Sequence, residues 1–174
     1  MMTLNAEAPH KLMNVYAEAL EGLRGKDLAA RCRAAGFGYD PVAIQLPFLG
    51  RPFVFSVADF DLVSDEADGD RTVAGANANR LSEQIVLLHY LAKASGVPHS
   101  GRLVGFDQLA GGRFYGSNFN KRLEQPLTRY FAGAPDRLRA VAKELGGRDA
   151  SYGDVSVEIT PLPRIPMTLI VWTG

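Results

Sequence analysis

The stretch Asn79–Gly96, NRLSEQIVLLHYLAKASG, decides the fold predicted for this chain, because it is the longest strongly helical and most apolar segment. Asn79 can cap the helix with its side-chain oxygen, and Gly96 is suited to end it. Apolar residues recur at three- and four-residue spacing and extend almost around the helix: Leu81, Ile85, Val86, Leu87, Leu88, Leu91 and Ala92. A helix of this length is too short to span a bilayer, which takes about 20 mainly apolar residues. We therefore expect a core helix that is packed on more than one side.

His89 and Tyr90 bring polar groups to this apolar helix. An imidazole in apolar surroundings must find a hydrogen-bond partner or stay uncharged, and an uncharged ring nitrogen is what a metal or a metal-bearing planar cofactor would use. Buried polar groups are usually hydrogen-bonded for structural reasons alone, so a satisfied core histidine is the alternative interpretation.

Composition narrows the classes of partner. The chain has 174 residues, which fits one domain, and 19 basic residues balance 19 acidic ones. A net charge of zero gives no general attraction to nucleic acid or anionic lipid, so we expect neither partner. The single cysteine, Cys32, cannot form an internal disulfide or assemble a metal site unaided. With no signal-peptide pattern at the N-terminus, these features indicate a cytoplasmic protein and predict no metal site.

Before the core helix, the spacing of apolar residues changes once, from a helical period to an alternating one. Helical periodicity predicts helices over residues 8–23 and 27–35, and alternating periodicity then predicts a hairpin over 42–57 with a short strand at 60–63. Pro47 and Pro52 weaken pairing near the turn, so the hairpin is expected at a sheet edge, where a protein partner could add a strand. The acidic segment 65–78 is interpreted as an exposed loop, with a calcium site as the disfavoured alternative.

After the core helix we expect a strand at 102–106 and a helical turn at 107–109. Gly111–Phe119, GGRFYGSNF, is either a connector or a cradle that offers backbone N–H groups and Arg113 to an anion. Pro126 divides the next helix into one part ending near Glu124 and another ending at Phe131. A helix at 135–145 and strands at 154–160 and 167–172 follow, with PLPRIP holding Arg164 between prolines. The second strand is apolar on both faces, so we expect the natural chain to continue beyond Gly174.

Together these elements predict an α+β fold of one domain, residues 1–174. We expect an antiparallel sheet that includes Ile44, Val54, Val157 and Leu169 and packs on a central buried helix around Leu88, with additional helices outside.

Three segments carry a family resemblance: EQIVLLHYLAKASGVP, FDQLAGGRFYGSNF with PLTRYF, and LGGRDASYGDVSVEITPLPRIPMTLIVW. From the Phe48–Arg51 turn to Trp172 the chain resembles a family of bacterial and archaeal proteins, mostly from anaerobes, that is catalogued as a domain of unknown function. Some members carry an N-terminal iron–sulfur module like that of the corrinoid iron–sulfur protein, whose cysteines this sequence lacks. The resemblance implies a place in low-potential one-carbon or corrinoid metabolism, and it brings no activity.

Three hypotheses about function follow. The first is a non-enzymatic binding or accessory protein of anaerobic cofactor metabolism. A corrinoid or another tetrapyrrole is the candidate that the resemblance implies, and the sequence itself identifies no cofactor. Its planar or anionic ligand would contact these residues: His89, Tyr90, Arg113, Tyr115 and Arg164. The second is a structural or regulatory subunit that binds a protein partner through the edge hairpin. The third is an enzyme of unrecognised type, for which the sequence shows no nucleophile elbow, metal triad or spaced carboxylate pair.

Overall fold

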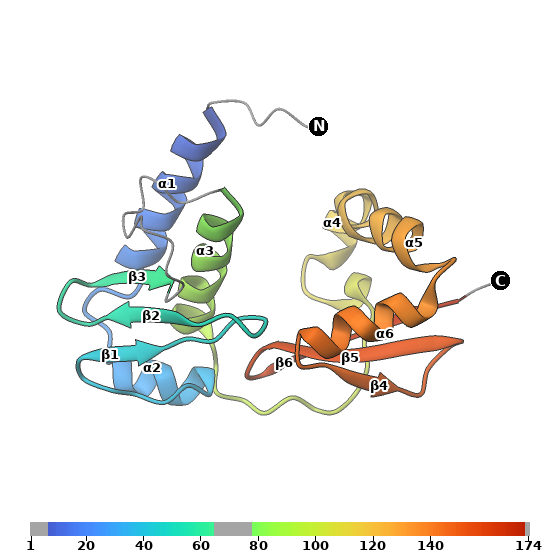
Figure 1. Ribbon diagram of the computed structural model, residues 1–174. Coiled ribbons are helices and arrows are strands. Elements are labelled where there is room, and N and C mark those ends of the chain that lie inside the picture. The colour runs from blue at the N-terminus through green and yellow to red at the C-terminus, as the bar shows by residue number, and fades with distance from the viewer. Residues whose placement is uncertain (1–6, 65–77, 173–174) are drawn as a thin grey trace. The chain divides into compact units, whose positions relative to one another are not determined.

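The computed structural model describes residues 7–64 and 78–172, which form two compact units (Figure 1). Unit 1 holds the described residues up to Val97 together with Leu162–Arg164, and unit 2 holds Pro98–Pro161 together with the described residues from Ile165 onward. Helices and antiparallel strands occur in both, so the α+β class is confirmed. The single domain stays a prediction. The acidic segment considered for calcium lies outside the described residues.

Unit 1 contains three helices and a three-stranded sheet of order β1-β2-β3: α1 (Glu7–Glu21), α2 (Leu28–Ala35), β1 (Ala43–Gln45), β2 (Phe53–Ser56), β3 (Asp61–Ser64) and α3 (Ala78–Lys93). The strand register places Ile44 opposite Phe55 and Phe55 opposite Leu62, so the three side chains form one row across the sheet. All three are fully buried and belong to one core cluster with residues of α1 and α3. Because successive strand residues face opposite sides, this row fixes which face of the sheet covers the core.

The helix α3 is amphipathic rather than apolar all round. Leu88 is fully buried, whereas Val86 is 44% exposed and His89 is half-buried. These two belong to a stripe at i, i+4, i+7 and i+11 that also contains Ser82 and Lys93, both exposed. The expectation of an apolar surface almost around the helix is therefore wrong on this side.

The hairpin between β1 and β2 closes with a tight turn. Leu49 and Gly50 both have positive φ, at 50° and 77°, and Phe48 and Arg51 exchange backbone hydrogen bonds of 2.9 Å. Two central residues of positive φ are the signature of a type I′ turn, whose twist matches that of the strands.

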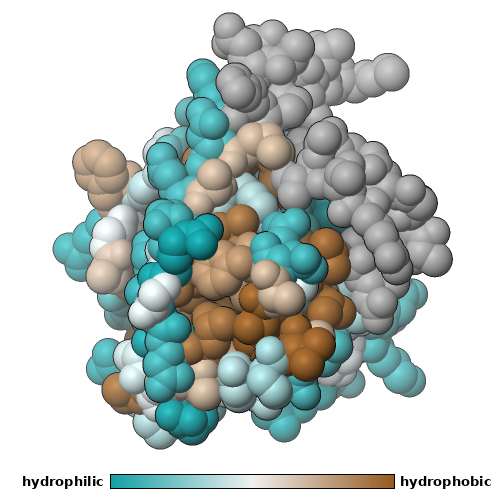
Figure 2. Space-filling view, turned by 90° about the vertical axis from the view of Figure 1, so that its left-hand side faces the viewer, coloured by the Kyte–Doolittle hydropathy of each residue, from teal (hydrophilic) through white to brown (hydrophobic). Residues whose placement is uncertain are grey.

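Half-buried hydrophobic side chains surround the core of unit 1, including Leu12, Leu20 and Phe60. On the face seen in Figure 2, hydrophobic residues gather in the middle within a frame of hydrophilic ones.

Unit 2 contains helices and a second three-stranded sheet of order β4-β5-β6: η2 (Phe106–Gln108), α4 (Gly112–Phe119), η3 (Asn120–Glu124), α5 (Gln125–Phe131), α6 (Pro135–Glu144), β4 (Arg148–Ala150), β5 (Val155–Leu162) and β6 (Ile165–Val171). Leu138 and Ala142 of α6 pack with Val155 and Val157 of β5 to form its core. The strand expected at 102–106 is absent, because those residues are irregular and exposed up to the η2 turn.

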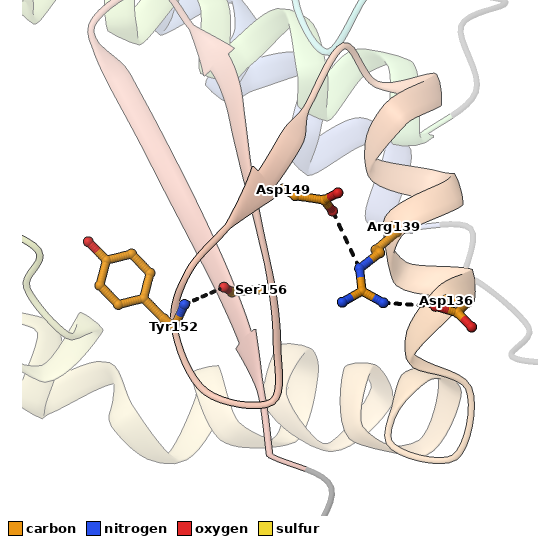
Figure 3. A network of polar contacts seen from close by, with 5 residues as sticks. All are labelled: Asp136, Arg139, Asp149, Tyr152 and Ser156. Atoms are coloured by element: carbon orange, nitrogen blue, oxygen red, sulfur yellow. Dashed lines mark hydrogen bonds and ion pairs between the residues drawn. The ribbon is translucent and has the colours of Figure 1, made fainter.

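Polar contacts attach α6 to this sheet (Figure 3). Arg139 lies 2.8 Å from Asp136 one turn earlier in α6 and 3.5 Å from Asp149 in β4. The backbone N–H of Tyr152 donates to the Ser156 hydroxyl at 2.8 Å and so closes the loop between β4 and β5.

The sheet of unit 2 is separate from that of unit 1. The single sheet expected to contain both Ile44 and Val157 is corrected to two sheets.

None of the helices in residues 7–64 and 78–172 combines the length and the apolar composition that crossing a bilayer requires.

Candidate ligand-binding groove

The segment from Gly112 to Phe131 is helical without a break, but one of its turns is wide. The segments α4, η3 and α5 meet at Asn120 and Gln125, and both residues have right-handed helical dihedrals. The η3 turn is a π-helix, in which the N–H of Gln125 bonds the carbonyl of Asn120. Pro126 follows directly and has no N–H to continue a regular α-helical ladder. The predicted division into two helices before Pro126 is therefore corrected to one continuous helix with a π turn, a feature frequent at functional sites.

A groove lies between this helix, α6 and β6. Its volume is about 730 Å³, within the range of about 300–1,000 Å³ typical of sites for small organic ligands. Its lining comes from unit 2 alone: Phe119, Asn120, Leu123, Glu124, Gln125, Leu127, Thr128, Arg129, Phe131, Ala132, Leu138, Thr168, Leu169, Ile170, Val171 and Trp172. Most of these side chains are apolar, and three are aromatic.

The wall formed by β6 is the edge of a strand. Thr168–Trp172 are consecutive, and all five line the groove. Side chains of consecutive strand residues point to opposite faces, so five in a row can line one groove only along the strand's edge. The strand order places β6 on the outside of its sheet, which agrees with this geometry. Trp172 lies at the end of this wall and is 71% exposed.

Polar groups of the groove gather at the π turn. The Gln125 amide donates to the Asn120 side-chain oxygen at 2.9 Å, and the Asn120 amide donates to the Glu124 carboxylate at 2.6 Å. The Glu124 charge is therefore partly satisfied within the helix. Arg129, one turn after Gln125, is exposed and has no ion pair within the described residues. The groove thus combines an apolar floor with one guanidinium that is free to meet a ligand.

A second, smaller hollow adjoins the groove. It has a volume of about 350 Å³ and shares two lining residues with the groove, Phe119 and Leu123. The remaining lining residues are Phe106, Tyr115, Asn118 and Arg122. The rings of Phe106 and Phe119 stack with centroids 3.8 Å apart, which joins the η2 turn to α4.

The structure brings together two of the five residues predicted to bind a ligand. The Tyr90 hydroxyl donates to the carbonyl of Ala35 at 2.6 Å and accepts from the backbone N–H of Arg164 at 3.2 Å. Burial raises the pKa of Tyr90, so this hydroxyl stays protonated as a donor. The Arg164 guanidinium donates to the carbonyl of Arg33 at 3.3 Å, near the C-terminal end of α2, where a cation suits the helix dipole. Tyr90 and Arg164 therefore hold the β5–β6 turn onto α2.

The other three residues lie elsewhere. His89 is half-buried on the stripe of α3 that also contains Val86 and Lys93, and it has no hydrogen bond within the described residues. Arg113 and Tyr115 are exposed residues of α4 in unit 2, and Tyr115 lines the smaller hollow. Gly112 packs so closely on η2 that a Cβ there would lie 1.8 Å from the carbonyl oxygen of Phe106. This packing gives the glycine a structural purpose and supports the connector interpretation of Gly111–Phe119. Ligand binding by the five predicted residues stays a prediction.

Sequence reasoning did not find the residues of the groove. The proline at 126 did signal an irregular helix. No periodic pattern links Leu127 on a helix to Leu169 on a strand, because their proximity depends on tertiary packing. Among the described residues, no three His, Cys, Asp or Glu side chains come together in a way that could hold a metal ion.

Comparison with known protein families gives a match. The family described as "Domain of unknown function (DUF3786)" matches residues 27–174. No curated protein matches the chain, and no solved structure matches it.

Proposed function

Because this chain belongs to the DUF3786 family, a domain of unknown function, we propose a function from its own groove: it is a non-enzymatic protein that binds a planar, largely apolar organic ligand in unit 2. The observation that carries the proposal is the groove of about 730 Å³ between the π-containing helix and the edge of β6. An apolar wall with a few converging polar groups is the usual composition of a small-molecule site.

Aromatic side chains favour a flat ligand. Phe119, Phe131 and Trp172 all line the groove, and aromatic rings bind other flat rings by offset or edge contacts. Arg129 adds a planar charged fork that suits a carboxylate on the same ligand. A planar body with an acidic substituent therefore satisfies both parts of the lining.

The ligand class includes tetrapyrroles, and a place in anaerobic corrinoid or tetrapyrrole metabolism is the finer part of the proposal. It rests on the resemblance to proteins of anaerobes, some joined to an iron–sulfur module. The groove lining contains no histidine, cysteine or methionine, so it offers no nitrogen or sulfur ligand to a metal. The macrocycle would be held by packing and by its carboxylates rather than by axial ligation. A cytoplasmic location belongs to the same proposal.

Trp172 provides the test, because it is the sole tryptophan of the chain and lines the groove. A metal-free porphyrin, protoporphyrin IX, is titrated into the purified protein while tryptophan fluorescence is followed. We expect saturable quenching with one site per chain. The variant Thr128→Phe places a ring in the groove at an exposed position, and we expect it to weaken binding at least tenfold.

Ser117→Phe is the matched control, because it adds the same ring at an exposed helix position that lines neither hollow. It should leave the affinity within about twofold of the parent, and circular dichroism should show both variants folded. Absence of saturable binding to the parent protein, or equal weakening by the two variants, would refute the assignment of the groove as the site.

A further inference from the structure

The smaller hollow lies directly beside the groove. Phe119 and Leu123 line both hollows, so the two hollows are adjacent, with these two side chains between them. Tyr115, Asn118 and Arg122 line the far side at i, i+3 and i+7, which places them along one face of the helix.

These three side chains offer hydrogen-bond donors. Arg122 is exposed and has no ion pair within the described part of the chain, and Tyr115 is 61% exposed, so its hydroxyl is accessible. A guanidinium carries its charge at every physiological pH and bonds carboxylate or sulfonate oxygens in a forked geometry. No carboxylate lines this hollow, whereas the groove contains Glu124. An anionic group is therefore better matched to the smaller hollow than to the π turn.

We propose that the hollow around Arg122 is an anion subsite, which holds an acidic arm of the ligand whose planar body occupies the groove. The inference rests on the proposed function and specifies its ligand class: a flat apolar body with an acidic substituent that extends across Phe119 and Leu123. Tyr115 and Asn118 donate to the same acidic group, and the Phe106–Phe119 ring stack holds the near wall in place.

Two fluorescent probes with the same ring skeleton separate the two claims. N-phenyl-1-naphthylamine is neutral, and 1-anilinonaphthalene-8-sulfonate adds one sulfonate. We expect both to bind the parent protein in the groove, and the sulfonate to bind more tightly. The preference should shrink as salt is raised, because exposed charges are screened.

Arg122→Gln should weaken the sulfonate probe about tenfold, which corresponds to the loss of one charge-assisted hydrogen bond, and leave the neutral probe within about twofold. Arg122→Lys keeps the charge and should restore part of the preference. Arg137→Gln is the matched control, because Arg137 is an exposed arginine of α6 that lines neither hollow. It should leave both affinities unchanged.

The outcomes distinguish failure of the subsite from failure of the groove. If neither probe binds the parent protein, the proposed function fails and the subsite fails with it. If both probes bind and Arg122→Gln changes neither affinity, the groove remains supported and the subsite is overturned. Equal losses for the two probes, or equal losses in Arg122→Gln and Arg137→Gln, also overturn it. So does a loss of the sulfonate preference in Arg129→Gln but not in Arg122→Gln, because the acidic arm would then lie in the groove itself.

Discussion

At the scale of single residues, buried polar groups join the elements of unit 1. The Tyr16 hydroxyl of α1 donates to the Asp61 carboxylate at 2.5 Å and accepts from the backbone N–H of Leu62 at 3.1 Å. The Gln84 amide of α3 donates to the Leu62 carbonyl at 2.6 Å. Arg31 of α2 donates to the carbonyl of Leu91 near the end of α3 at 3.0 Å. Each contact satisfies a group whose burial would otherwise cost free energy.

Because of Tyr16, we expect the protein to lose stability at alkaline pH. Burial, and then the hydrogen bond to Asp61, raise the pKa of Tyr16 well above its ordinary value. The folded chain therefore holds this proton more tightly than the unfolded chain, which ionises first as the pH passes about 10. The stability that depends on the protonated hydroxyl is fully present below about pH 10 and is lost as the pH rises further.

We expect Tyr16→Phe to lower the free energy of unfolding by about 1–3 kcal/mol at neutral pH, because the partners of the hydroxyl lose a hydrogen bond. Between about pH 10 and 12 the variant should lose stability less steeply than the parent. Urea denaturation at a series of pH values measures both effects. Tyr130→Phe, at a position that is 61% exposed, should leave the curve unchanged. Parallel curves for Tyr16→Phe and the parent would contradict the prediction.

The sequence identified some site residues as unusual without showing what they do. Tyr90 and Arg164 stand out in the sequence because their segments do not obviously need polar groups, and the structure places the two in contact with each other, 74 positions apart in the chain. The sequence predicts His89 among apolar neighbours, whereas it lies half-buried on the same stripe of α3 as the exposed Val86. Periodicity alone cannot decide this, because Val86 is apolar and exposed, so the pattern overestimates the buried arc of the helix.

At the scale of elements, the helix beginning at Gly112 shows how packing and propensity oppose each other. A Cβ at Gly112 would lie 1.8 Å from the carbonyl oxygen of Phe106, whereas a Cβ at Gly116 would have nothing within 4 Å. Backbone cannot move aside as a flexible side chain can. The first glycine is therefore required by the close approach of η2, and the second only weakens its helix.

We expect Gly116→Ala to raise the free energy of unfolding by about 0.5–1 kcal/mol, because alanine favours the helix. Gly112→Ala, in the same helix, should lower it by at least about 1–3 kcal/mol, because η2 must shift. Chemical denaturation midpoints compare the two variants directly. Shifts in the same direction would show that the contact between η2 and α4 is not as close as the structure has it.

Most elements could be predicted from local patterns, and their partners could not. The hairpin, the irregular helical turn before Pro126 and the two C-terminal strands follow from period, turn residues and proline chemistry. The sheet to which a strand belongs depends on contacts distant in sequence. The alternating patterns around Val54 and Val157 are alike, so they cannot show that the two residues belong to different sheets. The groove has the same origin, since it needs α5, α6 and β6 together.

At the scale of the whole molecule, a short segment at the end of the β5–β6 hairpin belongs to unit 1, although the rest of the hairpin belongs to unit 2. All of β6, and β5 up to Pro161, belong to unit 2, whereas Leu162–Arg164, which end β5 and form the turn to β6, belong to unit 1. Leu162 is 5% exposed within the core cluster of unit 1. Unfolding of unit 1 would therefore release the end of the β5–β6 hairpin, and one cooperative domain stays a prediction.

Differential scanning calorimetry tests that prediction, and we expect a single transition. Leu162→Ala removes a buried side chain at a cost of about 2–5 kcal/mol, so the whole transition should move down by at least about 4 °C. Ile165→Ala, three residues further along and 41% exposed, is the control and should move it by no more than about 2 °C. Two separate transitions, with only one displaced by Leu162→Ala, would mean that the units unfold independently. In that case the transition of unit 2 should keep its melting temperature in the Leu162→Ala variant. Protoporphyrin IX should still quench the Trp172 fluorescence of this variant, and the chain would count as two domains.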